Sequence, residues 1–328
     1  MADKPIVIAI TGPTATGKTA LGIELAKELD GEIISCDSMQ VYKNLAIGTA
    51  QPDEEELAQA RHHLVGFLEW EQSFSVSDYV KLAGKAIAEI ESRGKLPILV
   101  GGTGLYARAL LRGFTFTEEC RDDELREKLF AQARELGPEE MHRRLTKADP
   151  VAASEIHPNN VKRVLRALEY CMLSGEQFSE QTARSKQAEQ PYRYIMFCPV
   201  FRDRQVLYSR INARVDSMLE RGLLGEANKL YTFCKSTEKR PNAAQSIGYK
   251  ELFPYFDREI SLEEAVENIK RESRRYAKRQ ITWFAREPDI HYLYMDEFQS
   301  IEQALSECMK KLESSGLYTK PYKEVDAG

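Results

Sequence analysis

The first hundred residues alternate short apolar runs with longer stretches of helical periodicity. The apolar runs lie at residues 6–10, 32–35 and 98–100, and residues 18–29 between the first two repeat leucine at helical spacing. A second helix is expected from Ser77 to Arg93. Such alternation of strand and helix predicts an α/β fold, in which helices flank a parallel sheet.

The strand pattern disappears from about residue 117 to 192, where helix formers dominate and helices are expected at 122–136, 138–146 and 161–174. A strand pattern returns at 194–200, followed by helices at 204–232 and 261–285 and an apolar run at 291–295. We therefore expect an α/β core made of residues 1–116 and 193–315. A smaller all-helical insertion domain should occupy residues 117–192, with a frayed tail from 316 to 328.

The composition is typical of a soluble globular protein of about two domains, since 42% of the 328 residues are hydrophobic and 30% are charged. The net charge of −5 does not by itself indicate a nucleic-acid partner. The local distribution does, because residues 268–286 carry seven basic side chains and one acidic one. The residues after 286 carry nine acids and four lysines, so the chain is polarised in a way that fits an anionic partner on one face.

The six cysteines are scattered without a C-x-x-C pair, so a zinc site is not expected. No apolar stretch reaches the length of a signal peptide's core or a membrane span. We expect a reduced, cytoplasmic protein with no membrane contact, and a monomer.

Residues 12–19 match the P-loop pattern G-x-x-x-x-G-K-[ST] and stand between an expected strand and an expected helix. The motif consists of Gly12, Pro13, Thr14, Ala15, Thr16, Gly17, Lys18 and Thr19. Its backbone N–H groups can surround a phosphate, Lys18 adds a positive charge and Thr19 can hold Mg²⁺. The motif indicates phosphate binding, of which nucleotide or ATP binding is one form. A Walker-B strand is approximated only by residues 33–37, so ATP hydrolysis is weakly supported.

Three segments follow expected strands, namely residues 12–19, 37–40 and 101–106. Ligands of open α/β sheets bind outside the carboxyl ends of the strands, so these segments should meet at one site.

Seven segments in this order resemble the bacterial tRNA dimethylallyltransferases, also called tRNA isopentenyltransferases. They are residues 12–21, 37–42, 48–50, 101–106, 157–159, Arg163 with 166–169, and 277–283. The resemblance runs from residue 6 to about 285, and Gly104 stands where other members carry Met. It implies transfer of a dimethylallyl group from dimethylallyl diphosphate to N6 of adenosine 37 in tRNA, with Mg²⁺ as cofactor and the P-loop holding the isoprenoid's diphosphate.

The resemblance also implies roles for individual residues. The catalytic set is Asp37, Thr19, Thr103 and Arg214, with Thr19 as the metal ligand. The tRNA contacts fall on Asp37, Ser38, Met39, Gln40, Thr103, Arg126, Lys162, Arg163, Val164, Leu165, Arg166, Gln245, Ser246, Ile247, Gly248, Tyr249, Lys250, Arg274, Arg275, Lys278, Arg279, Gln280 and Ile281. Asp37 suits a general base, because an exocyclic adenine amine must lose a proton as it is alkylated. The alternative role for Asp37 is to cap a helix or to contact Mg²⁺ indirectly.

Other interpretations stay open. The basic run at 268–286 could be a solvated helix with an aromatic core stripe, and His62, His63 and His157 are taken as surface or packing residues. The first hundred residues also fit a P-loop kinase acting on a small metabolite or an RNA-binding nucleotide switch. Within the resembled group, an adenylate isopentenyltransferase would alkylate free AMP and would not need the helical insertion.

Overall fold

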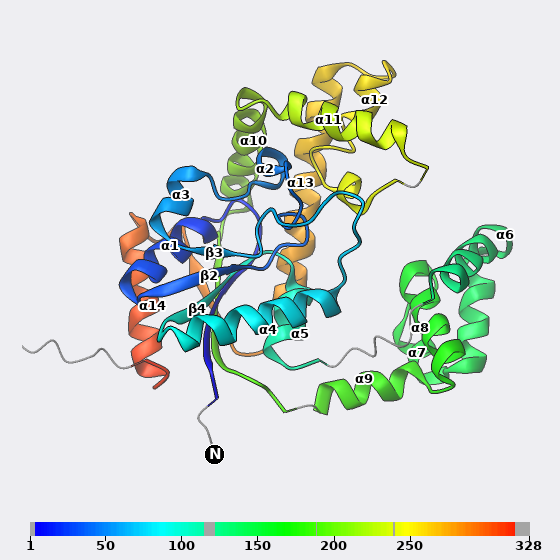
Figure 1. The fold of residues 1–328 in the computed structure, drawn as a ribbon, viewed down its shortest axis with the longest axis horizontal. Helices are drawn as coiled ribbons and strands as arrows, with labels where there is room; N and C mark the ends of the chain where they lie inside the picture. The colour runs from blue at the N-terminus through cyan, green and yellow to red at the C-terminus, as the bar shows by residue number, and fades with distance from the viewer. Residues whose placement is uncertain (1–3, 115–121, 188, 239, 319–328) are drawn as a thin grey trace, which may run out of the picture. The chain divides into compact units, whose positions relative to one another are not determined.

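A computed structural model describes residues 4–114, 122–187, 189–238 and 240–318 (Figure 1). The chain divides into two compact units, one formed by Met1–Leu111 with Pro191–Gly328 and the other by Arg112–Gln190. Parts of the expected insertion domain (117–121) and tail (319–328) lie outside the described residues. None of the helices in the described ranges is long and apolar enough to cross a membrane.

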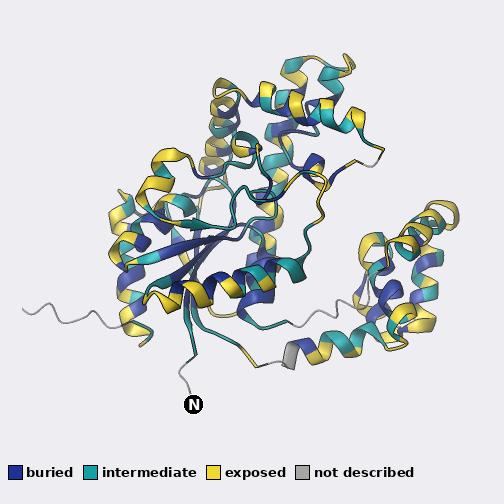
Figure 2. Ribbon diagram, viewed as in Figure 1, coloured by how far each residue is buried: buried dark blue, intermediate teal, exposed yellow. Residues whose placement is uncertain are grey.

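In the described part of the chain, a six-stranded parallel sheet has the order β3-β2-β4-β1-β5-β6. The strands are β1 Ile6–Thr11, β2 Gly31–Ser35, β3 His62–His63, β4 Leu96–Gly101, β5 Arg193–Val200 and β6 Ile290–Tyr294. Ile10 of β1 pairs with Val100 on one side and with Phe197 on the other. The expected α/β fold with a parallel sheet is therefore confirmed, and Figure 2 shows its central strands buried.

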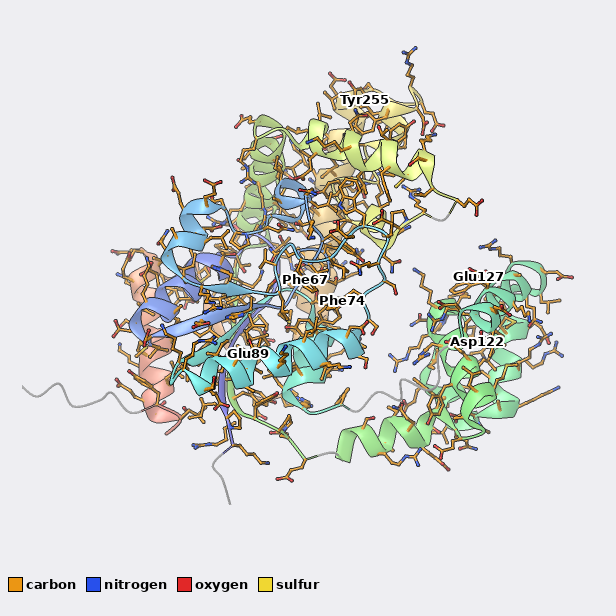
Figure 3. The ribbon with its side chains drawn as sticks, viewed as in Figure 1. Phe67, Phe74, Glu89, Asp122, Glu127 and Tyr255 are labelled. Atoms are coloured by element: carbon orange, nitrogen blue, oxygen red, sulfur yellow. The ribbon has the colours of Figure 1, made fainter. Side chains whose placement is uncertain are left out.

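Helices cover both faces of this sheet. The first unit contains α1 Lys18–Glu28, α2 Ala46–Thr49, α3 Glu54–Gln59, α4 Val76–Ser92, α5 Gly104–Leu111, α10 Arg204–Glu220, α11 Leu223–Ser236, η1 Asn242–Gln245, α12 Phe253–Phe256, α13 Leu262–Phe284 and α14 Ile301–Ser314. Because side chains alternate along a strand, Ile8 and Ile10 pack toward α1 and α14, whereas Val7 and Ala9 pack toward α4 and α5. Phe74 extends the core that contains Val7 and Ala9, and its ring is in edge contact with that of Phe67 (Figure 3).

Two expected helix boundaries were wrong. Helix α4 is capped by Ser75 rather than Ser77, because Ser75 Oγ accepts the N–H of Asp78 and the Asp78 carboxylate accepts the N–H of Ser75. The helix expected at 204–232 is two helices, since Gly222 adopts a positive φ of 99° between α10 and α11.

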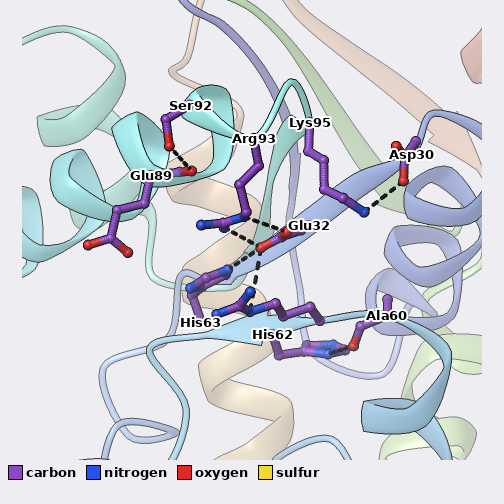
Figure 4. A network of polar contacts seen from close by, with 10 residues as sticks. Asp30, Glu32, Ala60, His62, His63, Glu89, Ser92, Arg93 and Lys95 are labelled. Carbon is purple, nitrogen blue, oxygen red and sulfur yellow. Dashed lines mark hydrogen bonds and ion pairs between the residues drawn. The ribbon is translucent and has the colours of Figure 1, made fainter.

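The buried carboxylate of Glu32 connects strands at the edge of the sheet through hydrogen bonds and ion pairs (Figure 4). Glu32 of β2 accepts hydrogen bonds from Arg93 and from His63 of β3 at 2.7 Å each, and Arg61 lies 3.7 Å away. Burial alone would raise the pKa of this carboxyl, but the bonds from Arg93 and His63 and the nearby charges hold it below its ordinary value. His63, taken from the sequence as a surface or packing residue, is thus a partner of Glu32.

The second unit is helical in its described part and comprises α6 Asp123–Ala148, α7 Pro150–Glu155, α8 Val161–Ser174 and α9 Phe178–Gln187. Asp122, labelled in Figure 3, caps α6 by accepting the N–H groups of Glu124 and Leu125. The helix kinks at Gly137, where φ is 83°, which agrees with the two helices expected on either side of this residue. The core of the unit is apolar and includes Leu129, Met141, Leu145, Val164, Leu165 and Leu168.

Candidate active site

A cavity of about 310 Å³ lies where β1, β2 and β4 end and is walled by α10 and α13. Its lining includes P-loop residues, the segment after β2, the end of β4 and residues 245–250. The three strand-end segments expected from the sequence therefore meet at one place. Its predicted members are Thr14, Lys18, Thr19, Asp37, Ser38, Met39, Gln40, Arg214, Gln245, Ser246, Ile247, Gly248, Lys250, Arg279 and Gln280.

The P-loop takes a sharply curled conformation between β1 and α1. Gly12 and Gly17 have positive φ angles of 149° and 88°, and Ala15 has 64°. A Cβ at position 12 would lie 3.0 Å from Cys198 Sγ, so glycine is needed there for close approach as well as for conformation. The loop is thus shaped by its own backbone and leads directly into the N-terminus of α1, the arrangement that favours an anion.

Lys18 is a partly buried cation at this loop and donates to the carbonyl oxygen of Pro13. Burial and, to a smaller extent, the charge of Arg214 lower its pKa to about 8, although Asp37 and Cys198 act in the opposite direction. Burial also lowers the pKa of Arg214. Two desolvated cations side by side repel each other, and an anion bound between them would relieve that repulsion.

Helix α10 supplies both arginines that touch the P-loop. Arg214 donates to the hydroxyl of Thr14 at 3.3 Å, and Arg210 donates to the carbonyl oxygen of Ala15 at 3.0 Å. The two positions are four residues apart and therefore lie on one helical face. This face contacts the phosphate-binding loop, which excludes a purely solvated role for it.

Asp37 lines the cavity directly after β2. Its Oδ1 accepts the N–H groups of Met39 at 2.9 Å and Gln40 at 3.3 Å, which closes a tight turn. No donor to Oδ2 is recorded among the described residues. Thr103 supports the same segment, because its hydroxyl accepts the N–H of Ser38 at 3.0 Å and its own N–H donates to Cys36. One carboxylate oxygen is therefore fixed by the backbone and the other is available for chemistry.

Apolar side chains of α10 and α13 form part of the cavity wall and were missed from the sequence, whereas Ile247 was expected at the site. Helix α10 contributes Ile211, Val215 and Met218, at i, i+4 and i+7, while Ile269 and Ile247 complete the wall. The spacing of these side chains on the same helix as Arg214 was the available signal. The cavity is thus lined by both cationic and apolar side chains.

Helix α13 presents a second stripe to the cavity. Ile269, Ser273, Tyr276 and Gln280 lie at i, i+4, i+7 and i+11 of this helix. Burial, together with the negative charge of Asp37, raises the pKa of the Tyr276 hydroxyl. Ser273 and Tyr276 were not assigned to the site from the sequence.

A partly buried hydrogen-bond cluster lies behind Gly48, which lines the cavity. The Glu226 carboxylate accepts the N–H groups of Ile47 and Gly48, and the Tyr249 hydroxyl donates to it at 2.6 Å. Tyr249 is itself fully buried, and a Cβ at Gly48 would lie 2.5 Å from its ring. Glu226 therefore joins the segment at 46–49 to the segment at 245–250.

The other residues expected to contact RNA differ in how exposed their side chains are. Lys162 and Arg163 are exposed on α8, but the Val164 and Leu165 side chains lie in the core of the helical unit. Arg126 and Arg166 both pair with the buried Glu169, at 2.9 and 3.1 Å.

On α13, Lys278 and Arg279 are exposed, and Arg275 is exposed while it pairs with Glu272. Arg274 donates to Asn212 of α10, and Ile281 packs against the buried core between α10 and α13.

Gly104 is explained by its neighbour Trp283. A Cβ at position 104 would lie 2.2 Å from the indole, whose face also carries the guanidinium of Arg108 at 4.3 Å. A methionine at position 104 would require this ring to move.

The cavity offers few protein ligands for a metal ion. Among the described residues, no three His, Cys, Asp or Glu side chains gather to hold one. The Thr19 hydroxyl and the Asp37 carboxylate both line the cavity. Mg²⁺ commonly takes one or two protein oxygens and completes its shell with water and phosphate oxygens. These residues therefore fit a Mg²⁺ shared with a bound diphosphate.

The sequence of this chain is similar to a known protein family and to individual proteins. Residues 40–287 match the family model described as IPP transferase. The chain is 45% identical over 312 residues to the tRNA dimethylallyltransferase of Acetivibrio thermocellus, which covers 95% of this chain and 99% of that protein. It is 47% identical over 292 residues to the tRNA dimethylallyltransferase of Bacillus subtilis, covering 89% of this chain and 91% of that protein.

Solved structures agree with the sequence matches. The tRNA isopentenylpyrophosphate transferase of Bacillus halodurans superposes with a TM-score of 0.69 at 42% identity and covers 96% of this chain and 99% of its own. A eukaryotic dimethylallyltransferase acting on tRNA superposes with a TM-score of 0.83 at 30% identity, covering 97% of this chain and 81% of that one.

Proposed function

The chain belongs to the IPP transferase family, and from this membership and the geometry of its cavity we propose that it transfers a dimethylallyl group from dimethylallyl diphosphate to N6 of adenosine 37 in tRNA. The observation that carries the proposal is one cavity lined by cationic side chains at the P-loop, by apolar side chains and by the Asp37 carboxylate. A diphosphate ester of a short isoprenoid has the matching anionic and apolar ends.

In the proposed reaction N6 attacks the first carbon of the dimethylallyl group. The bond from that carbon to the diphosphate oxygen breaks, and its electron pair leaves with the diphosphate. The proton on N6 passes to the Asp37 carboxylate, whose Oδ1 is held by the backbone while Oδ2 stays available. Asp37 thereby removes the positive charge that would build up on the nitrogen.

The cationic side chains of the cavity stabilise the charge that gathers on the leaving group. Lys18, Arg214 and the P-loop N–H groups are fixed in place before the reaction, so little reorganisation is needed as the charge develops. Mg²⁺, when bound through Thr19, would neutralise part of the same charge.

The target base must leave the anticodon stack to reach this cavity. We assign the phosphate contacts to the exposed bases on α13, which are Arg275, Lys278 and Arg279, and to Lys162 and Arg163 on α8. The cavity-lining residues 37–40 and 245–250 would hold the flipped adenine and its neighbour, adenosine 36.

The proposal is tested by incubating an anticodon stem-loop RNA with the protein, dimethylallyl diphosphate and Mg²⁺, followed by mass spectrometry of the nucleosides. We expect one five-carbon unit on one adenosine. Modification of AMP but not of RNA would indicate an adenylate isopentenyltransferase. Transfer of phosphate from labelled ATP to a small molecule, with no prenylated RNA, would indicate a kinase.

A further inference from the structure

We propose that Gln280 is a positioning residue that fixes the phosphate-binding loop through hydrogen bonds to two strand-end loops. This assignment rests on the proposed function and replaces the expectation that the Gln280 side chain contacts tRNA. The side chain is 5% exposed, reaches from α13 into the cavity wall, and uses both ends of its amide.

The two bonds join segments that are distant in sequence. The Gln280 oxygen accepts the N–H of Thr14 in the P-loop at 2.9 Å, and its nitrogen donates to the carbonyl oxygen of Gly102 at 2.9 Å. The Thr14 N–H belongs to the P-loop backbone, whose other N–H groups are the expected phosphate donors. Holding this one N–H against α13 therefore determines where the rest of the loop points.

The space around the amide is shaped to fit it. A Cβ at Gly102 would lie 2.2 Å from the Gln280 nitrogen and 3.3 Å from the carbonyl oxygen of Gly12. The glycine after β4 thus lets the glutamine lie between the two loops. Two further contacts hold the same two loops, because Arg214 of the adjoining α10 also bonds to Thr14 and Trp283 of α13 packs on Gly104.

The test uses the variants Gln280→Met and Gln280→Glu, which keep the length of the side chain. The probe is the unreactive dimethylallyl S-thiolodiphosphate, whose affinity is measured by calorimetry from about pH 5.5 to 8.5. At pH 8 both variants should bind the probe about 10- to 100-fold more weakly than the wild type, as expected for loss of a buried hydrogen bond. Anticodon stem-loop affinity should change less than about twofold.

The glutamate variant gives a signature that a general packing defect lacks. Its protonated acid can accept from Thr14 and donate to Gly102 as the amide does, whereas its carboxylate faces the Gly102 oxygen without a proton. Burial raises the pKa of such a carboxyl, so the deficit relative to wild type should shrink as the pH falls. The deficit of Gln280→Met should stay constant over the same range, because methionine does not titrate.

Gln303→Met on α14 is the matched control, since Gln303 is exposed and accepts one hydrogen bond from Gln299. It should leave probe affinity unchanged, and thermal melting of all three variants reports the stability of the fold. Unchanged probe affinity with weaker RNA binding in the Gln280 variants would overturn the inference and restore a tRNA contact. A pH-independent deficit in Gln280→Glu would also overturn it. If the wild type itself fails to bind the probe, the proposed function fails instead.

Discussion

The guanidinium of Arg214 lies 3.3 Å from the hydroxyl of Thr14, so helix α10 bonds directly to the P-loop. This arginine is partly buried, and burial lowers its pKa. Arg214→Gln should therefore slow the chemical step by about 10²- to 10³-fold, because a fixed donor aimed at developing charge is lost.

The matched control is Arg210→Gln on the same face of α10, where the exposed Arg210 bonds to the backbone of Ala15. Its effect on the single-turnover rate should be several-fold smaller. Equal reductions of the single-turnover rate in the two variants would mean that α10 only supports the conformation of the P-loop.

The shifted pKa of Lys18 predicts a pH dependence for diphosphate binding. With a pKa of about 8, the free protein loses the Lys18 charge as the pH rises through 8, whereas a bound anion stabilises the protonated form. Affinity for the thiolodiphosphate probe should thus be highest below pH 8 and fall by up to about tenfold per pH unit above it. Lys18→Ala should bind weakly and remove this fall, and a wild-type affinity that is flat from pH 7 to 9.5 would contradict the assignment.

The exposed bases of α13 predict a salt-dependent term in RNA binding. Replacing Arg275 and Lys278 by glutamine should weaken stem-loop binding for every tRNA sequence and flatten log K against log salt by about 0.7 to 0.9 per lost contact. The control is Lys81→Gln with Lys85→Gln, two exposed lysines on α4. The idea is wrong if the two double variants have the same slope between about 50 and 200 mM salt.

The Glu32 cluster predicts an acid-sensitive contribution to stability. Its carboxyl has a lowered pKa in the folded protein, so its stabilisation is present above the unfolded value and disappears as the pH falls through the folded one. Glu32→Gln should lower the free energy of unfolding by about 1 to 3 kcal/mol at pH 7, as measured in urea. The difference in the free energy of unfolding between this variant and the wild type should become smaller below about pH 4. If that difference stays constant with pH, the Glu32 charge does not contribute to stability.

Local sequence patterns were enough to predict much of this architecture. The P-loop, the strand-end segments and the kink at Gly137 each depend on residues close together in sequence, so spacing and glycine chemistry located them. The errors also have local causes, because Ser75 competes with Ser77 as a cap and only the conformation of Gly222 separates α10 from α11. The bond from Gln280 to Thr14 spans 266 positions, and no sequence period connects such residues.

The same limit explains the missed part of the site. The apolar wall and the contact between Glu226 and Tyr249 form only when distant helices pack together. The division of Lys162 to Arg166 into exposed and buried side chains likewise follows from the helical core of the second unit.

The central claim is that Asp37 accepts the proton of the adenine amine in this cavity, and the single-turnover rate of Asp37→Asn tests it most directly. Asparagine keeps an oxygen to accept the N–H groups of Met39 and Gln40, so the turn and the RNA affinity should be preserved. With saturating dimethylallyl diphosphate and stem-loop RNA, the rate should fall by about 10²- to 10⁴-fold. A near-wild-type rate in this variant, with RNA affinity unchanged, would contradict the account.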